Sequence, residues 1–318
     1  MTFRTKIFTP GALTKVHRDL IYKAKNQKLL LNDPGITVTM SNDEELQLLP
    51  MHMPDRPNKK KSLQRLVDLL QDNSDWQNLP AFLEGMQLAG EVLPKGYMER
   101  FVRKANEQGR AGILIRCAEM VKKTGMTLAD PAVTTELILG IHSRAARAHF
   151  RGEEMDKALR QAQEIALLME KPEHCGGGAK AALKDGHRDM RRDLTVLGAL
   201  LELRAAQTDQ AATGDVIFSR VETLAAKIMA FWPQQQVLTV DEDVTAARKQ
   251  LECWLPLWAG FKLALKGPWL RDPELRGKVT KACGELGDVI ELARVKVEEA
   301  AGGRTRRCLH MYNDVKDL

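Results

Sequence analysis

The feature that most limits the fold is a nearly unbroken series of amphipathic helix patterns, which begins at Lys59 and fills most of the remaining chain. Residues 104–125, KANEQGRAGILIRCAEMVKKTG, predict the end of one helix, a turn at Gly109 and a second helix that ends at Gly125. Isolated helices shorter than about 12 to 15 residues are marginal in water. Each helix must therefore bury its apolar face against a neighbour, and we expect helical hairpins.

The composition is that of a helical globular protein. Apolar residues make up 44% of the 318 residues, charged residues 28% and aromatic residues only 5%. No apolar run approaches the roughly 20 residues that span a bilayer, so no membrane span is expected. The five cysteines are widely spread and form no CxxC pair, which favours a reducing compartment and disfavours structural zinc. We expect no cofactor.

The order of these patterns predicts an all-α fold, in which helical hairpins stack as a superhelical array or bundle behind an extended N-terminal arm. Within the arm, Ile36–Met40 suggests a short strand, and four prolines by position 57 argue against long regular elements. The predicted domains are a basic helix and arm at 1–58, hairpin repeats at 59–172, a long-helix bundle at 179–301 and a basic tail at 302–318.

The positive charge of the chain is concentrated at its start. Residues 1–31 contain seven Lys or Arg residues and only one acid, Asp19, whereas the other 287 residues hold 41 basic and 41 acidic groups. Such a segment is a mitochondrial targeting peptide, a retained arm that neutralises phosphates, or simply a solvated helix face. Two further basic clusters occur. One begins the first long helix pattern, and the other lies in a predicted loop at 302–312, after the last long helix pattern. The candidate RNA-binding residues are Arg4, Lys6, Lys15, Arg18, Lys23, Lys25, Lys28, Lys59, Lys60, Lys61, Arg304, Arg306 and Arg307.

Motifs of known enzyme chemistry are missing from the sequence. Gly176–Lys180 resembles a phosphate loop only in its glycines, since the GxxxxGK[ST] spacing is absent, and a turn is favoured. His142 and His149 share a helix face, but no acid completes a metal site, so surface or cap roles are expected. HExxH, GxSxG and GxGxxG do not occur. We therefore expect a protein that is not an enzyme and has no small-molecule substrate.

Two other patterns have structural explanations. The acidic pairs at Glu153–Glu154 and Asp241–Asp243 precede helix patterns, where carboxylates favour the helix dipole. Trp254, Trp258, Phe261 and Leu265 form one helical stripe, which either packs in the core or stacks on bases, and core packing is favoured.

Residues 101–131, FVRKANEQGRAGILIRCAEMVKKTGMTLADP, resemble the pentatricopeptide repeat, and a second, weaker unit extends the resemblance over 97–171. This family is typically organellar and binds single-stranded RNA with one base per repeat. The base-recognising positions fall on Glu99 and on Ala129 or Asp130, where the usual Asn, Thr or Ser is missing. The resemblance therefore implies degenerate hairpins that form a scaffold.

As a whole, the basic arm, the proline-containing linker and the helical body resemble accessory proteins of the fungal mitochondrial ribosome, most plausibly of its large subunit. This resemblance implies a structural ribosomal constituent in the mitochondrial matrix, with rRNA and neighbouring ribosomal proteins as partners. Two alternatives remain: a pentatricopeptide-like organellar RNA-binding factor for translation or RNA processing, and an assembly scaffold of a respiratory complex.

Overall fold

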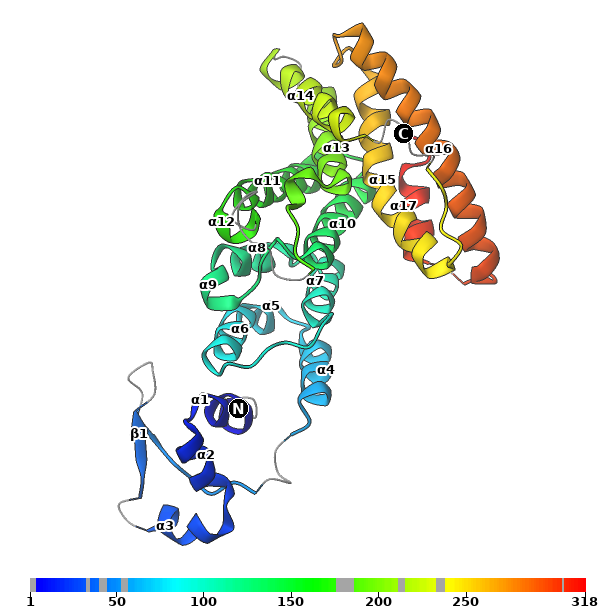
Figure 1. Ribbon diagram of the computed structural model, residues 1–318. Coiled ribbons are helices and arrows are strands. Elements are labelled where there is room, and N and C mark those ends of the chain that lie inside the picture. The colour runs from blue at the N-terminus through cyan, green and yellow to red at the C-terminus, as the bar shows by residue number, and fades with distance from the viewer. Residues whose placement is uncertain are drawn as a thin grey trace. The chain divides into compact units, whose positions relative to one another are not determined.

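The computed structural model describes residues 4–32, 35–39, 45–52, 57–175, 186–210, 215–232, 238–304 and 306–318. Over these residues the chain is mostly helical, with one short two-stranded sheet, which confirms the predicted all-α class (Figure 1). Contacts divide the chain into two compact units. Unit 1 is Met1–Lys104 with Arg116–Met126, and unit 2 is Ala105–Ile115 with Thr127–Leu318. The predicted boundaries at 58, 172 and 301 remain predictions.

The N-terminal part of unit 1 consists of short helices and one hairpin. Its elements are η1 (Arg4–Phe8), α1 (Thr9–Ala12), α2 (Lys15–Tyr22), η2 (Ala24–Asn26), α3 (Gln27–Leu31), β1 (Thr37–Thr39) and β2 (Glu45–Gln47). The strands are antiparallel, with Val38 opposite Leu46, so β1 corresponds to the strand expected at 36–40.

This N-terminal part has a small core of its own. The core consists of Leu13, Ile21, Leu30 and Leu48, with Ile36 and Val38 packed against it. Two backbone hydrogen bonds of 2.8 Å close it, from Leu48 N to Ile36 O and from Met51 N to Ile21 O. The segment expected to be an extended arm thus returns onto the basic helix, because Leu48 buries its side chain there.

The rest of unit 1 is built from short packed helices: α4 (Lys59–Leu69), α5 (Asn73–Gln77), α6 (Leu79–Leu88) and α9 (Val121–Thr124), together with parts of α7 (Tyr97–Glu107) and α8 (Ala111–Glu119). The predicted turn at Gly109 and the helix end at Gly125 are confirmed, but the predicted second helix is divided at Met120 into α8 and α9. Gly109 turns between α7 and α8 with φ 69°, and Gly125 ends α9 in the left-handed region with φ 70°. Residues other than glycine rarely adopt these backbone conformations.

Unit 2 contains the longer helices: α10 (Pro131–Arg147), α11 (Gly152–Met169), α12 (Pro172–Cys175), η4 (Met190–Arg192), α13 (Leu194–Gln210), α14 (Asp215–Phe231), α15 (Val244–Lys266), α16 (Pro273–Ala301) and α17 (Arg307–Val315). Asp130, Asp243 and Asp272 begin α10, α15 and α16 by accepting backbone N–H bonds of 2.8–3.0 Å. The prediction that Asp241–Asp243 precede a helix is confirmed, and Glu153 and Glu154 lie in the first turn of α11.

Two glycines allow α13 and α15 to cross with their backbones in contact. A Cβ at Gly198 would lie 2.5 Å from the Cα of Leu257, and one at Gly260 would lie 2.8 Å from the carbonyl oxygen of Gly198. Phe261, from the predicted aromatic stripe, is fully buried here and contacts Trp232 edge to face, with 5.8 Å between ring centroids. Core packing is therefore confirmed for Phe261.

The residues after α16 form another helix, α17 (Arg307–Val315), so the prediction of a loop at 302–312 is wrong for 307–312. Cys308, Met311 and Val315 are buried along one face of α17, and this apolar face stabilises the helix. Tyr312 stacks on Trp258 of α15, with an interplanar angle of 7° and 6.1 Å between centroids. Lys262 covers the Trp258 ring at 4.1 Å, and Arg294 of α16 lies 5.6 Å from the Tyr312 ring. The ring stack therefore joins α15 to α17, and the cation–π contact of Arg294 joins α16 to α17.

Candidate nucleic-acid interface

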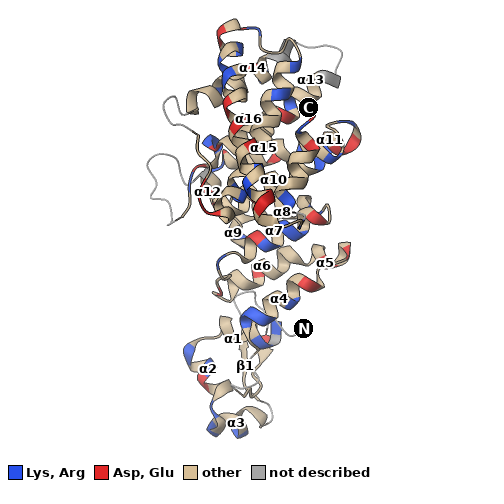
Figure 2. Cartoon of the chain, turned by 90° about the vertical axis from the view of Figure 1, so that its right-hand side faces the viewer, with Lys and Arg blue, Asp and Glu red and all other residues tan. Residues whose placement is uncertain are grey.

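All seven basic residues predicted within 1–31 have exposed side chains, and Figure 2 marks the Lys and Arg residues of the N-terminal helices in blue. The short helices place them there. Leu13, Ile21 and Leu30 point into the small core, so the polar positions between them face outward. The apolar spacing thus determines which side of these helices carries positive charge.

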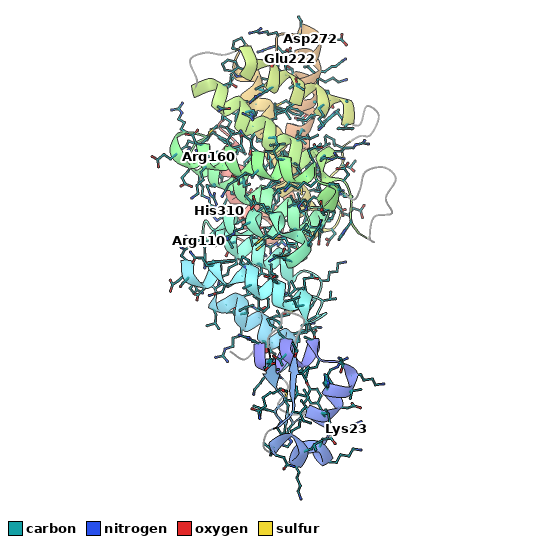
Figure 3. The ribbon with its side chains drawn as sticks, turned by 90° about the vertical axis from the view of Figure 1, so that its left-hand side faces the viewer. Lys23, Arg110, Arg160, Glu222, Asp272 and His310 are labelled. Carbon is teal, nitrogen blue, oxygen red and sulfur yellow. The ribbon has the colours of Figure 1, made fainter. Side chains whose placement is uncertain are left out.

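Five of the seven are free of ion pairs with the described residues. We call them the cationic cluster, and its members are Lys6, Lys15, Arg18, Lys25 and Lys28. Lys23, labelled in Figure 3, instead binds Asp19 at 2.7 Å, and this hydrogen bond lowers the pKa of the Asp19 carboxyl group. Arg4 also interacts within the chain. The cluster therefore carries five positive charges without an ion pair to a described carboxylate, although the charges of Lys15 and Lys25 also help to lower the pKa of Asp19.

Of the three lysines at the start of α4, one is ion-paired and two are free of ion pairs with described residues. Lys59 donates to the carboxylate of Glu91 at 2.6 Å and to the carbonyl oxygen of Val92 at 2.8 Å. Lys60 and Lys61 are exposed and make no ion pair with described residues. The first turn of α4 contains no acid, and cations there oppose the helix dipole by roughly 0.3–1 kcal/mol each. An external anion would remove this unfavourable interaction.

The C-terminal cations belong to unit 2, so the structure does not join them to the cationic cluster. Arg304 is exposed and Arg306 is half-buried. Arg307 Nη1 lies 2.5 Å from the Glu136 carboxylate, which is only 6% exposed. Glu136 therefore balances the charge of Arg307, and this weighs against a phosphate contact by Arg307, which remains a prediction.

The positions that align with pentatricopeptide base recognition have roles within the chain. Glu99 pairs with Arg103 at 2.8 Å, and Asp130 accepts the backbone N–H of Ala132 at 3.0 Å to begin α10. Ala129 is buried. These side chains are not available to specify a base.

The structure contains a buried pair of titratable side chains that the sequence did not predict. His142 Nδ1 lies 2.8 and 2.9 Å from the two carboxylate oxygens of Glu202, and both residues are fully buried. The predicted surface or cap role of His142 is therefore wrong, since α13 covers this face of α10. Burial raises the pKa of Glu202. Because both side chains are buried, no substrate can reach them. The His142–Glu202 pair instead joins α10 to α13.

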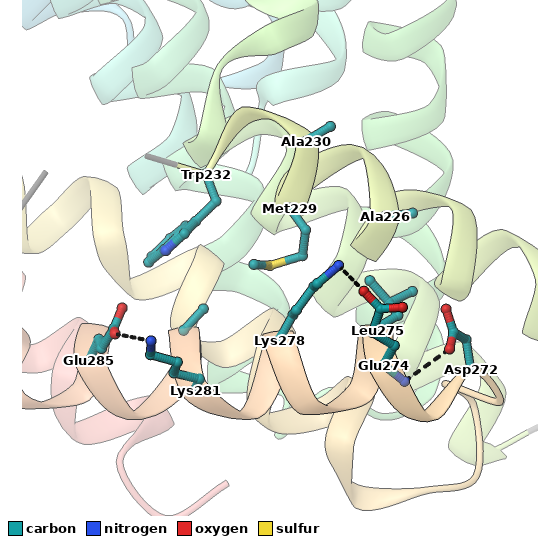
Figure 4. Close-up of a pocket in the computed structure, with 11 residues that line it drawn as sticks. Ala226, Met229, Ala230, Trp232, Asp272, Glu274, Leu275, Lys278, Lys281 and Glu285 are labelled. Atoms are coloured by element: carbon teal, nitrogen blue, oxygen red, sulfur yellow. Dashed lines mark hydrogen bonds and ion pairs between the residues drawn. The ribbon is translucent and has the colours of Figure 1, made fainter. Parts of the chain in front are cut away.

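Other candidate chemistry is not supported by the described part of the chain. Within it, no group of three metal-ligating side chains converges, and no helix is long and apolar enough to cross a membrane. Gly176–Lys180 lies outside the described residues. The hollows include a groove of about 670 Å³ between α14 and α16, whose charged residues pair with one another along one helix (Figure 4).

Comparison with known proteins identifies the family. The family model described as mitochondrial ribosomal protein mS27 matches residues 1–314. The small ribosomal subunit protein mS27 of Neurospora crassa is 28% identical over 265 residues, which are 83% of this chain and 63% of that protein. The chain thus spans less than two thirds of the length of this relative. The prediction of a large-subunit protein is wrong, because the Neurospora crassa relative is named as a small-subunit protein. The chain belongs to the mitochondrial ribosomal protein mS27 family.

Proposed function

We propose that this chain is a structural constituent of the small subunit of the mitochondrial ribosome, in the matrix. It contacts rRNA through the cationic cluster with Lys60 and Lys61, and it contacts neighbouring proteins through its helical body. The observation that carries this proposal is the set of five exposed, unpaired cations on a segment with its own folded core. A preformed surface of this kind holds its charges in place before it binds.

The chemistry of this surface fits phosphates better than bases. Lysine and arginine neutralise backbone phosphates without regard to sequence. Recognition of unpaired bases requires aromatic rings that are free to stack. Phe8 is not free, because it packs on Phe82 with 5.5 Å between ring centroids. We therefore infer that this surface positions the protein on folded rRNA.

The start of α4 belongs to the same surface. Glu91, the partner of Lys59, also lies beside α1, since a Cβ at Gly11 would meet its Cγ at 3.5 Å. Lys60 and Lys61 therefore begin a helix adjacent to the N-terminal helices of unit 1 and extend the phosphate-binding surface.

The pentatricopeptide-like alternative is disfavoured by the side chains at its base-recognising positions, which cap a helix, pair with Arg103 or are buried. We propose that the hairpin of α7 and α8 acts as a scaffold without base specificity. Neither the scaffold nor the cationic cluster supplies a nucleophile with a base, so we propose no enzymatic activity.

Sucrose-gradient sedimentation of mitochondrial lysate tests the function. We expect the wild-type chain to sediment with the small subunit and to move to light fractions after ribonuclease treatment. Sedimentation with the large subunit, or light fractions that ribonuclease does not change, would contradict the proposal. The second result would favour a respiratory-complex scaffold.

A variant with all five residues of the cationic cluster changed to Gln should leave the subunit at lower salt than the wild type. The matched control changes Lys23 and Lys59, which are already ion-paired, and should behave like the wild type. Both variants are compared at equal matrix levels, and the mass of the matrix form shows whether residues 1–31 are retained after import. Removal of these residues on import would refute the role of the cluster.

A further inference from the structure

The groove between α14 and α16 has an apolar floor formed by Met229, Trp232, Leu275 and Ala282 (Figure 4). Ala226 and Ala230 lie one turn apart on α14, and their small side chains leave room in the groove on that side. One end of the groove is fixed where the carboxylate of Glu222 accepts the backbone N–H groups of Arg271 and Asp272 at 3.0 and 2.9 Å (Figure 3).

The lysines along the groove are neutralised on their own helix. Lys278 binds Glu274 at 2.5 Å, and Lys281 lies 3.8 Å from Glu285. Both pairs have i,i+4 spacing on α16, and Figure 4 shows them as dashed lines. The groove therefore presents no unbalanced cation to a phosphate, which makes RNA an unsuitable occupant.

The side of α16 that lines the groove continues beyond the groove itself. Leu275, Lys278, Ala282 and Glu285 line the groove at alternating spacings of three and four residues, and the next positions in this series are 289 and 292. Val289 is buried, but Leu292 is 64% exposed, and Val295 beside it is 38% exposed. Together, the groove and these two exposed side chains define what we call the α16 face.

Three charged side chains around Leu292 and Val295 form no ion pair with a described residue, and two of them are carboxylates. The third is Lys296, whose ammonium group donates to the carbonyl oxygen of Asp241 at 2.7 Å. Asp288 lies one turn before Leu292, and Glu299 lies one turn after Val295. Both carboxylates are exposed, and neither forms an ion pair with a described residue. The carboxylates outnumber the lysine, so this face favours an occupant that brings apolar side chains together with positive charge.

We propose that the α16 face binds a basic amphipathic helix of a neighbouring small-subunit protein. The 20 residue steps from Leu275 to Val295 span about 30 Å at 1.5 Å per residue, enough for several turns of a partner helix. Amphipathic helices occupy such grooves with apolar residues at i, i+3 or i+4 and i+7. This inference rests on the proposed function, which supplies the ribosome as the source of the partner.

Site-specific photo-crosslinking in assembled subunits tests the proposal. p-Benzoylphenylalanine replaces Leu292 in the full-length chain, and in a matched control it replaces Leu167, which lies on α11 of the same unit and is 71% exposed. Subunits are isolated on a gradient, irradiated and analysed by mass spectrometry. We expect the probe at 292 to crosslink to a basic amphipathic segment of another protein, and the probe at 167 not to reach that segment.

Two sets of substitutions test the chemistry of the α16 face. Ala226→Arg with Ala230→Arg fills the groove, and Asp288→Lys with Glu299→Lys reverses the free charges on exposed positions. Each should lower the crosslink yield about tenfold. The charge-reversal variant alters only solvent-exposed side chains and is expected to keep the fold.

Several outcomes would overturn the inference. A crosslink from 292 to rRNA or to a second copy of this chain would contradict the proposed occupant. If the chain sediments with the small subunit but gives no protein crosslink, the α16 face is not a docking surface. An equal crosslink from 167 to the same segment would show the same. Either result would leave the proposed function intact. A wild-type chain that does not sediment with the subunit would refute the proposed function and this partner with it.

Discussion

The salt dependence of rRNA binding follows directly from the number of unpaired cations. Each phosphate that a lysine or arginine neutralises releases condensed counterions, and this contributes about 0.7–0.9 to the slope of log K against log salt concentration. Changing all five residues of the cationic cluster to Gln should therefore make the slope shallower by about 3.5–4.5. The side chains are exposed, so the free energy of unfolding should change by less than about 0.5 kcal/mol for each substitution.

Fluorescence anisotropy of the purified full-length chain with labelled small-subunit rRNA, measured across a salt series, gives the slope. The matched control, Lys23→Gln with Lys59→Gln, removes charges that Asp19 and Glu91 already balance, and should change the slope by less than one unit. An unchanged slope in the five-residue variant, or an equal change in the control, would refute the assignment of rRNA contacts to the unpaired cations.

Three further predictions concern unit 2 and the buried thiol of unit 1. His142→Ala leaves the carboxylate of Glu202 buried without its partner and should lower the free energy of unfolding by about 3–5 kcal/mol in denaturant titrations; a loss below about 1 kcal/mol would show that the pair contributes little. Gly198→Ala places a Cβ 2.5 Å from the backbone of α15 and should cost about 1–3 kcal/mol, whereas Gly277→Ala, in open space on a helix, should raise the melting temperature; equal effects would contradict this packing. Burial raises the pKa of Cys117 to about 12, so native protein at pH 8 should resist iodoacetamide at this thiol until it unfolds, and labelling without unfolding would show that the thiol is accessible.

Features encoded by neighbouring residues were predictable from the sequence. The turn at Gly109 and the helix end at Gly125 depend on backbone conformations that glycine adopts without strain. Asp243 is recognisable because a carboxylate just before an apolar periodic segment caps the helix that follows. The fold class follows from the same local patterns repeated along the chain.

Features that join distant residues were not predictable. Glu202 lies 60 residues from His142, and Glu136 lies 171 residues from Arg307. Periodicity shows that each helix has a buried face, but it does not show which helix covers that face. A buried histidine and a neutralised arginine were therefore interpreted as surface residues.

The choice of ribosomal subunit failed for a related reason. Positive charge and helical hairpins suit a protein of either subunit, because both subunits present phosphate backbones and protein surfaces. For the same reason, the seven N-terminal cations look equivalent in sequence, and the division into five unpaired residues and two with partners becomes visible only when Asp19 and the helices are placed in space.

The stack of Lys262, Trp258, Tyr312 and Arg294 makes one indole ring an optical reporter for the last helix. Lys262 also donates to the carbonyl oxygens of Val315 and Lys316, at 3.3 and 2.6 Å. Detachment of α17 would therefore strip the indole of its stacked ring and change the surroundings of the ammonium above it. The chain has five tryptophans, so in a variant with the other four changed to Phe the emission of Trp258 should register local opening of the C-terminal helix separately from melting of the buried core.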